Sequence, residues 1–233
     1  MKLSKILSYI LHPIFMPIIV MYVALNYVEY YMLIFENYEL PLYISLSIFT
    51  IIFPLIATII FVKTNKVESL KMNIREERGG PILSFIFIMI IGFPIFNRIA
   101  QLSSFLTAMY VSIIVILAFA YFISKKWKIS LHMMGIGGAT GSFIALNYIF
   151  GGLYYWVICF ITLSGLLAFS RLDLKAHNRP QVYTGFVLGS LLQSIIIINY
   201  NSIISTISIF RSSIASLLYT EFLLSFGLSL TFF

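Results

Sequence analysis

Histidines and cations occur together in three short segments that separate long apolar runs. The residues of interest in these segments are Lys71, Arg78, Lys128, Ser130, His132, Ser170, Arg171, Asp173, His177 and Gln181. An arginine side chain binds two phosphate oxygens at once, and a lysine adds a mobile positive charge. A neutral imidazole can attack phosphorus, while a second, protonated imidazole gives its proton to the leaving oxygen. The set therefore predicts phosphoryl transfer.

Two other phosphatase chemistries do not fit the sequence. Cys159 is the one cysteine, and the residues after it include no arginine that would close a phosphate loop. A metal-dependent enzyme needs clustered carboxylate and imidazole ligands, whereas the chain has a single aspartate, Asp173. We expect a metal-free histidine mechanism without a cofactor.

The composition is that of an integral membrane protein. Hydrophobic residues make up 61% of the 233 residues and charged residues 10%, against about 25% charged in soluble domains. Apolar runs of about 20 residues are long enough to cross a bilayer as helices. The runs predict an all-α, polytopic bundle in one membrane domain, residues 1–233, with spans near 8–28, 40–62, 81–96, 103–124, 131–150, 152–170 and 182–199. The stretch 202–233 is predicted to be either an eighth span or an interfacial helix followed by a short span.

The basic residues gather on one side of this predicted topology. Seven spans place the three segments and the N-terminus together, so that all but two of the 15 basic residues, Arg98 and Arg211, share a side. The positive-inside rule makes that side cytoplasmic. The net charge of +7 lies in short loops between apolar runs, where we expect it to meet an anionic membrane lipid and no nucleic acid.

Small residues four apart occur in two predicted helices, as Gly137 with Gly141 and Gly185 with Gly189. Such pairs allow close helix approach in lipid. The stretch around Gly135 also looks like a nucleotide-binding glycine loop, but no strand precedes it. We therefore expect helix contacts at these glycines.

The three segments resemble the motifs of the type-2 phosphatidic acid phosphatase superfamily, K-x6-R-P, P-S-G-H and S-R-x5-H-x3-D, in order and spacing. The matching residues are Lys71 and Arg78, then Ser130 and His132, then Ser170, Arg171 and His177. The departures are Gly79 for proline, Ile129 and Leu131 for proline and glycine, and Gln181 for aspartate. The resemblance covers roughly residues 63–190, and the start around His12-Pro13 looks like a Bacteroidetes branch of that superfamily.

The resemblance implies a six-helix membrane core, here with one or two extra helices, and a lipid phosphate or polyprenyl (di)phosphate substrate. It implies that His177 is the nucleophile, that His132 is the general acid, and that the phosphate is held by Lys71, Arg78, Ser130 and Arg171. The resemblance also implies the inner membrane of a bacterial cell. By analogy the site would face away from the cytoplasm, which is opposite to the side that the charge count indicates.

Gln181 is the departure with the greatest consequence, because the family's aspartate orients the nucleophilic imidazole. A glutamine carbonyl accepts a hydrogen bond but carries no charge. In serine-protease triads, replacing the orienting aspartate with asparagine costs about 10⁴-fold in rate. Asp173, four residues before His177, and Lys128 are further candidates for a supporting role.

Three hypotheses follow. The first is a membrane phosphatase acting on a lipid phosphate or polyprenyl (di)phosphate. The second, motivated by Gln181, is a protein that binds a phospholipid headgroup without hydrolysing it. The third is a lipid transporter or flippase, for which Pro13, Pro17, Pro54 and Pro94 would supply kinked helices.

Overall fold

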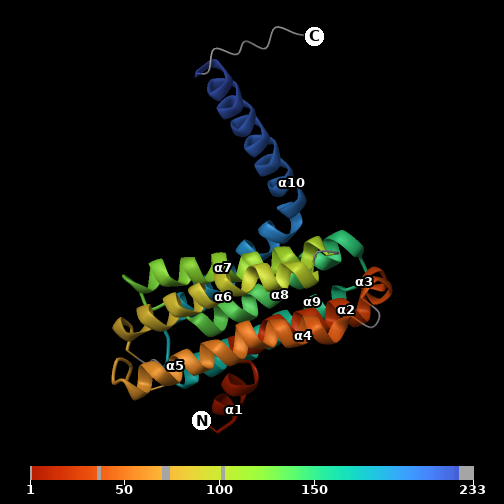
Figure 1. The fold of residues 1–233 in the computed structure, drawn as a ribbon. Coiled ribbons are helices and arrows are strands. Elements are labelled where there is room, and N and C mark those ends of the chain that lie inside the picture. Colours follow the sequence, from red (N-terminus) through yellow and green to blue (C-terminus); the bar gives the residue numbers. More distant parts are fainter. Residues whose placement is uncertain (1, 36–37, 70–73, 101–102, 226–233) are drawn as a thin grey trace. The chain divides into compact units, whose positions relative to one another are not determined.

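The chain is built of helices throughout the part that the structure describes (Figure 1). The computed structural model describes residues 2–35, 38–69, 74–100 and 103–225, with side chains as far as 203 and at 205. The elements are α1 (Lys2–Ile10), η1 (Pro13–Phe15), α2 (Met16–Tyr27), α3 (Glu29–Ile34), α4 (Glu39–Ser47), η2 (Ile48–Ile52), α5 (Phe53–Lys63), η3 (Glu76–Arg78), α6 (Gly79–Ala100), α7 (Ser104–Ser124), α8 (Leu131–Phe150), α9 (Tyr154–Asp173) and α10 (Arg179–Ser225). The all-α prediction is confirmed.

Seven helical segments are long and apolar enough to cross a membrane, as the sequence predicts. They are Lys2–Tyr27, Glu39–Lys63, Glu76–Ala100, Ser104–Ser124, Leu131–Phe150, Tyr154–Asp173 and Arg179–Ile203. The third is longer than the predicted 81–96, because the helix extends through less apolar residues at both ends. The chain is therefore a multi-pass membrane protein.

Prolines shape the first two spans. The first breaks after Ile10, and the 3₁₀ turn η1 begins at Pro13, so that α1 and α2 are separate helices. In the second, the π-helical turn η2 precedes Pro54, which has no N–H to offer the carbonyl one turn back. At these breaks, His12 before η1 and Thr50 in η2 line a cavity inside the bundle.

The last helix differs from the sequence prediction. A separate helix over 202–233 is not found, because α10 runs without interruption from Arg179 to Ser225. The sequence has no glycine or proline between Gly189 and Gly227 that would end it. Residues 226–233 lie outside the described part. The chain divides into two compact units, Met1–Ile198 and Asn199–Phe233, and the first contains all the site residues discussed below.

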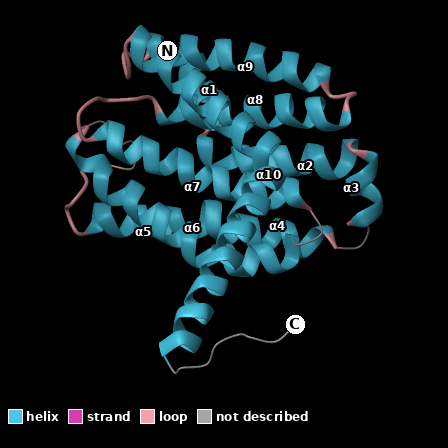
Figure 2. Cartoon of the chain, turned by 90° about the horizontal axis from the view of Figure 1, so that it is seen from above, coloured by secondary structure: helices cyan, strands magenta, loops and turns pink. Residues whose placement is uncertain are grey.

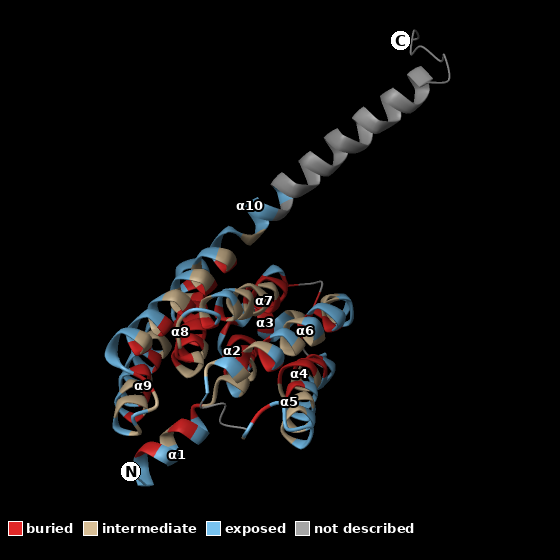
Figure 3. Ribbon diagram, turned by 90° about the vertical axis from the view of Figure 1, so that its left-hand side faces the viewer, coloured by how far each residue is buried: buried red, intermediate tan, exposed pale blue. Residues whose placement is uncertain are grey.

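Helix α8 is the most buried of the seven spans (Figure 3). In its most apolar 18-residue stretch 67% of the residues are buried, against 22–39% in the other six. A helix surrounded in this way has neighbours on every face, so small side chains are needed wherever another backbone comes close.

The first unit's part of α10 packs directly on the backbone of α8. A Cβ atom added at Gly137 or Gly141 would collide with the carbonyl oxygens of Phe186 or Ser190, and one at Gly189 with that of Met134. The expectation of close helix contact at these glycine pairs is confirmed. Ser194 of α10 also donates from Oγ to the carbonyl oxygen of Gly141 at 3.0 Å, so a hydrogen bond adds to the close packing of the pair.

This contact brings the beginnings of α8 and α10 together. Figure 2 shows the described chain as helices joined by loops. The backbone N–H of Ser130 donates to the carbonyl oxygen of Gln181 over 3.3 Å. A Cβ atom at Gly185 would lie 2.8 Å from the carbonyl oxygen of Ser130. The second and third sequence motifs are thus joined through main-chain atoms.

We predict that Gly189→Ala destabilises the protein by about 1–3 kcal/mol, because the added methyl group must push α10 away from α8. Unfolding in detergent, followed by circular dichroism, measures this. Gly165→Ala is the matched control, since nothing lies within 4 Å of a Cβ at that exposed position of α9. There we expect no loss, or a gain of up to about 1 kcal/mol. Equal effects of the two substitutions would contradict the close contact.

Candidate functional site

A cavity of about 1280 Å³ lies within the first unit, bordered by η1, η2 and all the helices from α1 to α10 except α3 and α4. Its polar part is lined by three histidines and five cations: His12, His132, His177, Lys5, Arg78, Lys128, Arg171 and Lys175. No carboxylate is among the lining residues of the described chain. The lining of the cavity therefore favours an anionic ligand.

His177 is buried and is oriented by Gln181. Its Nδ1 atom lies 3.1 Å from Gln181 Oε1, which also accepts a hydrogen bond from the backbone N–H of Asn178 at 3.2 Å. The backbone N–H of Gln181 in turn donates to Asn178 Oδ1 at 3.1 Å. This reciprocal pair is the pattern of a capping box at the first turn of α10.

The capping box fixes the tautomer of His177. The backbone N–H of Asn178 is a donor, so the Gln181 atom that it meets must be the carbonyl oxygen and not the amide nitrogen. That oxygen can only accept, so His177 Nδ1 carries the proton in the neutral ring. The Nε2 atom keeps its lone pair, which is the form that a nucleophile requires.

The electrostatic environment keeps this ring neutral. Burial lowers the pKa of His177 to about 4; the bond to Gln181 opposes the shift, and the charges of Arg78, Arg171 and Lys128 add to it. The pKa of Lys128 is lowered too, first by burial and then by Arg78 and Arg171. A bound anion would oppose the effect of these cations and raise the pKa of both His177 and Lys128.

The candidate phosphate ligands lie at the same end of the bundle. Arg78 is buried and donates from Nη1 to the carbonyl oxygen of Ile129 over 3.0 Å, next to Ser130. The Ser130 Oγ and Arg171 Nε atoms are both buried and have no hydrogen-bond partner in the described part of the chain. Buried polar atoms without a partner are costly. Arg171 lines the cavity, so its Nε atom is suited to contact a ligand, whereas Ser130 is not among the lining residues.

Arg171 and Asp173 are tied to the N-terminal helix. Arg171 Nη1 donates to Ser8 Oγ at 3.1 Å, and Ser8 Oγ lies 2.8 Å from Ser170 Oγ. Ser170 Oγ donates to the carbonyl oxygen of Ser4 at 2.6 Å, and Ser4 Oγ donates to Asp173 Oδ2 at 2.5 Å. These bonds hold α1 against α9.

Asp173 therefore does not orient His177. Its carboxylate accepts from Ser4, whereas the Nδ1 atom of His177 meets Gln181. A supporting role for Asp173 at the imidazole needs a helix that continues from 173 to 177, whereas α9 ends at Asp173 and α10 begins at Arg179. Asp173 instead helps to dock α1.

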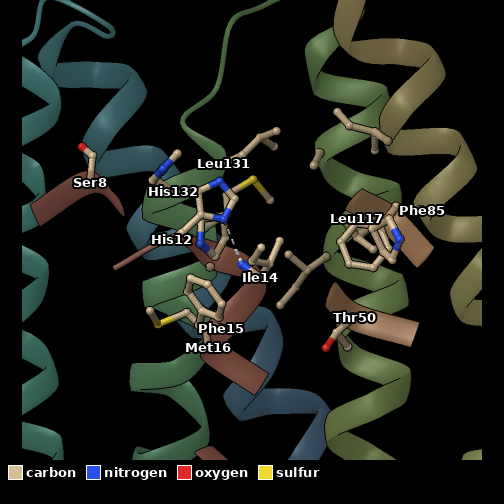
Figure 4. A pocket seen from close by; sticks show the side chains of 18 of the residues that line it. Ser8, His12, Ile14, Phe15, Met16, Thr50, Phe85, Leu117, Leu131 and His132 are labelled. Atoms are coloured by element: carbon tan, nitrogen blue, oxygen red, sulfur yellow. Dashed lines mark hydrogen bonds between the residues drawn. The ribbon is translucent and has the colours of Figure 1, made fainter. Parts of the chain in front are cut away.

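His132 has a neighbour that the motif analysis does not include. The ring centroids of His132 and His12 lie 4.9 Å apart, with an interplanar angle of 81° (Figure 4). His12 comes from the turn before η1, far from the three motifs in sequence. The signal that could have identified it is the pair His12-Pro13, a titratable residue at a helix break inside an apolar run.

The remaining part of the cavity is apolar. It extends between α7, α6 and α2, where Ile113, Ile116, Leu117, Phe85 and Val20 line it. Figure 4 shows Phe85 and Leu117 on the side of the cavity away from His132. A ligand that fills the whole cavity has an anionic head and a hydrocarbon body.

The sequence-predicted residues of the described chain fall into three groups by position. His132, His177, Arg78, Lys128 and Arg171 line one cavity. Gln181 and Ser130 do not line the cavity: Gln181 bonds to His177, and Ser130 bonds to the carbonyl oxygen of Gln181. Asp173 bonds to Ser4 of α1. Lys71 lies outside the described residues. No group of three imidazole, thiol or carboxylate side chains that would hold a metal ion is present in the described segments.

Comparison with family models, with curated proteins and with solved structures finds no match for this chain.

We predict that the His177 ring is neutral at pH 6 and protonated at Nδ1, with a pKa near 4. Because the bond to Gln181 raises the pKa of His177, Gln181→Leu should lower it further and Gln181→Glu should raise it. Ring ¹⁵N chemical shifts in histidine-labelled protein report tautomer and charge, and the chain has only three histidines. A ring that titrates near 6.5 in all three proteins would contradict this.

Proposed function

We propose that this chain is a membrane phosphatase that hydrolyses a lipid phosphate or polyprenyl (di)phosphate through a phosphohistidine. The observation that carries the proposal is His177, whose proton is held at Nδ1 and whose Nε2 lone pair is available beside Arg78, Arg171 and His132. The resemblance of the three motifs to the type-2 phosphatidic acid phosphatase superfamily supports the same reaction.

The first half of the reaction transfers the phosphoryl group to the protein. The Nε2 lone pair of His177 forms a bond to phosphorus, and the bond from phosphorus to the lipid oxygen breaks. His132, protonated once the anion is bound, gives its proton to that oxygen, so the lipid leaves as an alcohol, or as a monophosphate from a diphosphate. Gln181 keeps its bond to Nδ1–H while the imidazole becomes positively charged.

In the second half, water attacks the phosphohistidine from the side that the lipid has left. His132 takes a proton from the water, the bond from phosphorus to Nε2 breaks, and inorganic phosphate forms. His132 is then protonated and His177 neutral, as before the first transfer. No metal takes part in this sequence, since the two imidazoles supply both nucleophile and acid.

Positive charges stabilise the transition state of both halves. Arg78 and Arg171 come from different elements, and each is fixed by a hydrogen bond, to Ile129 O and Ser8 Oγ respectively. Charge that spreads over the phosphoryl oxygens therefore meets donors that need no reorganisation. The beginnings of α8 and α10 add the positive ends of two helix dipoles.

The apolar part of the cavity supports a lipid rather than a soluble substrate. Its lining residues continue from the cationic part without an intervening charged group in the described chain. Burying a hydrocarbon chain there contributes about 0.8 kcal/mol per CH₂. A soluble phosphate ester would leave this part of the cavity unused.

We predict that His177→Ala abolishes phosphate release by the purified protein from lipid phosphates in detergent, by about 10³-fold or more, because the nucleophile is gone. A panel of diacyl and prenyl phosphates, assayed for inorganic phosphate, measures this. Cys159→Ser, an exposed change on α9, is the control and should keep full activity. Equal release by wild type and His177→Ala would disprove the histidine mechanism.

A second candidate function is binding of a phospholipid headgroup without hydrolysis, and the neutral Gln181 favours it. A glutamine holds the tautomer of His177 but gives little electrostatic stabilisation to an imidazolium, so the first transfer would be slow. Wild-type protein that binds anionic lipid saturably, binds it less tightly after Arg171→Ala and releases no phosphate would support this function instead.

We predict that Gln181→Glu raises turnover by at least about tenfold and by no more than about 10⁴-fold. A carboxylate at this position stabilises the positively charged ring of His177. Glutamate also fits the capping box, so the first turn of α10 is preserved. Gln181→Leu, which removes both hydrogen bonds of the carbonyl, should lower turnover. A Gln181→Glu protein that binds lipid phosphate normally but turns over no faster would contradict the assigned role.

A further inference from the structure

His12 is a lining residue of the cavity that none of the three motifs contains. It lies at the break between α1 and η1, and its ring packs edge-on against that of His132. Figure 4 shows the two rings side by side in the cavity. His12 therefore lies beside the proposed general acid, where one of its ring nitrogens can contact a ligand.

The place of His12 is fixed by its neighbours on both sides. Pro13, the next residue, packs against α8 so tightly that a Cβ atom at Gly135 would lie 2.5 Å from Pro13 Cβ. On the other side, α1 is held to α9 by the hydrogen bonds of Ser4 and Ser8. The histidine between these two anchors cannot leave the cavity without breaking one of them.

The tautomer of His12 is the opposite of that of His177. The backbone N–H of Ile14 donates to His12 Nδ1 over 3.4 Å, so that nitrogen carries a lone pair and the proton of the neutral ring is on Nε2. No hydrogen bond to Nε2 occurs in the described part of the chain. His177 therefore offers a lone pair to the cavity, whereas His12 has an N–H donor to offer.

We propose that His12 is a phosphate-binding residue, and that its Nε2–H donates to an oxygen of the phosphoryl group on which His177 acts. The inference rests on the proposed function, because it assigns a further ligand to the same site. It gives the N-terminal segment a direct part in binding: α1 supplies Ser8, which holds Arg171, and the residue before η1, His12, contacts the anion itself.

Two substitutions separate this role from simple capping of η1. In His12→Asn the side-chain carbonyl takes the place of Nδ1 and keeps the cap, but nothing reaches the place of Nε2. In His12→Gln the side-chain amide reaches the place of Nε2 and restores a donor. A hydrogen bond to a charged group corresponds to about a 10- to 100-fold change in affinity.

The experiment measures binding of orthovanadate and of inorganic phosphate to the purified full-length chain in detergent by calorimetry. We expect His12→Asn to bind each anion about 10- to 100-fold more weakly than wild type, and His12→Gln to recover at least half of that loss on a logarithmic scale. If His12→Asn binds as tightly as wild type, or if the two variants are equally weak, His12 does not donate to the anion.

Ring ¹⁵N spectra of histidine-labelled wild-type protein test the same claim without a substitution. We expect the Nε2–H signal of His12 to persist when orthovanadate is added and to shift, while that of Nδ1 changes little. A His12 ring with its proton on Nδ1, or one whose signals do not move as those of His177 do, would overturn the inference. Wild-type protein that binds neither anion would instead overturn the proposed function.

Discussion

The contact between the backbones of α8 and α10 is the constraint on which the site depends. Glycines on both helices let main-chain atoms touch, and a single added methyl group at Gly137, Gly141 or Gly189 would separate them. Since Ser130 also donates to the Gln181 carbonyl, the beginnings of the two helices are held together. Close helix approach in lipid thereby becomes a means of placing His132 and His177 at one cavity.

Hydrogen bonds that involve backbone N–H groups then determine the tautomers of His177 and His12. Asn178 N–H fixes the amide of Gln181, which fixes the proton of His177 at Nδ1, whereas Ile14 N–H takes the lone pair of His12 Nδ1. Two histidines of the same cavity thus have opposite tautomers without a carboxylate at either. In the proposed reaction, the neutral Gln181 would leave a positively charged His177 ring dependent on the phosphoryl group for stabilisation.

Hydrogen bonds to other parts of the fold position two of the cavity's cations. Arg78 is fixed by a backbone carbonyl next to Ser130, and Arg171 by a serine of α1. In the lining of the cavity, as far as the structure describes it, no aspartate or glutamate competes with an anion. Asp173, which the sequence offered as a partner for His177, is used to dock α1, and through α1 it helps to place Ser8 and His12.

The sequence alone determined the helical membrane architecture, because apolar runs of span length have no other stable arrangement in a bilayer. It also determined the contacts at Gly137, Gly141, Gly185 and Gly189, since their spacing places small residues on one helix face. Only the tertiary structure decided the partners of the polar groups. His12 meets His132 because the helix breaks before Pro13. Asp173 bonds to Ser4 because α1 packs against α9. Both contacts join residues that are distant in the sequence.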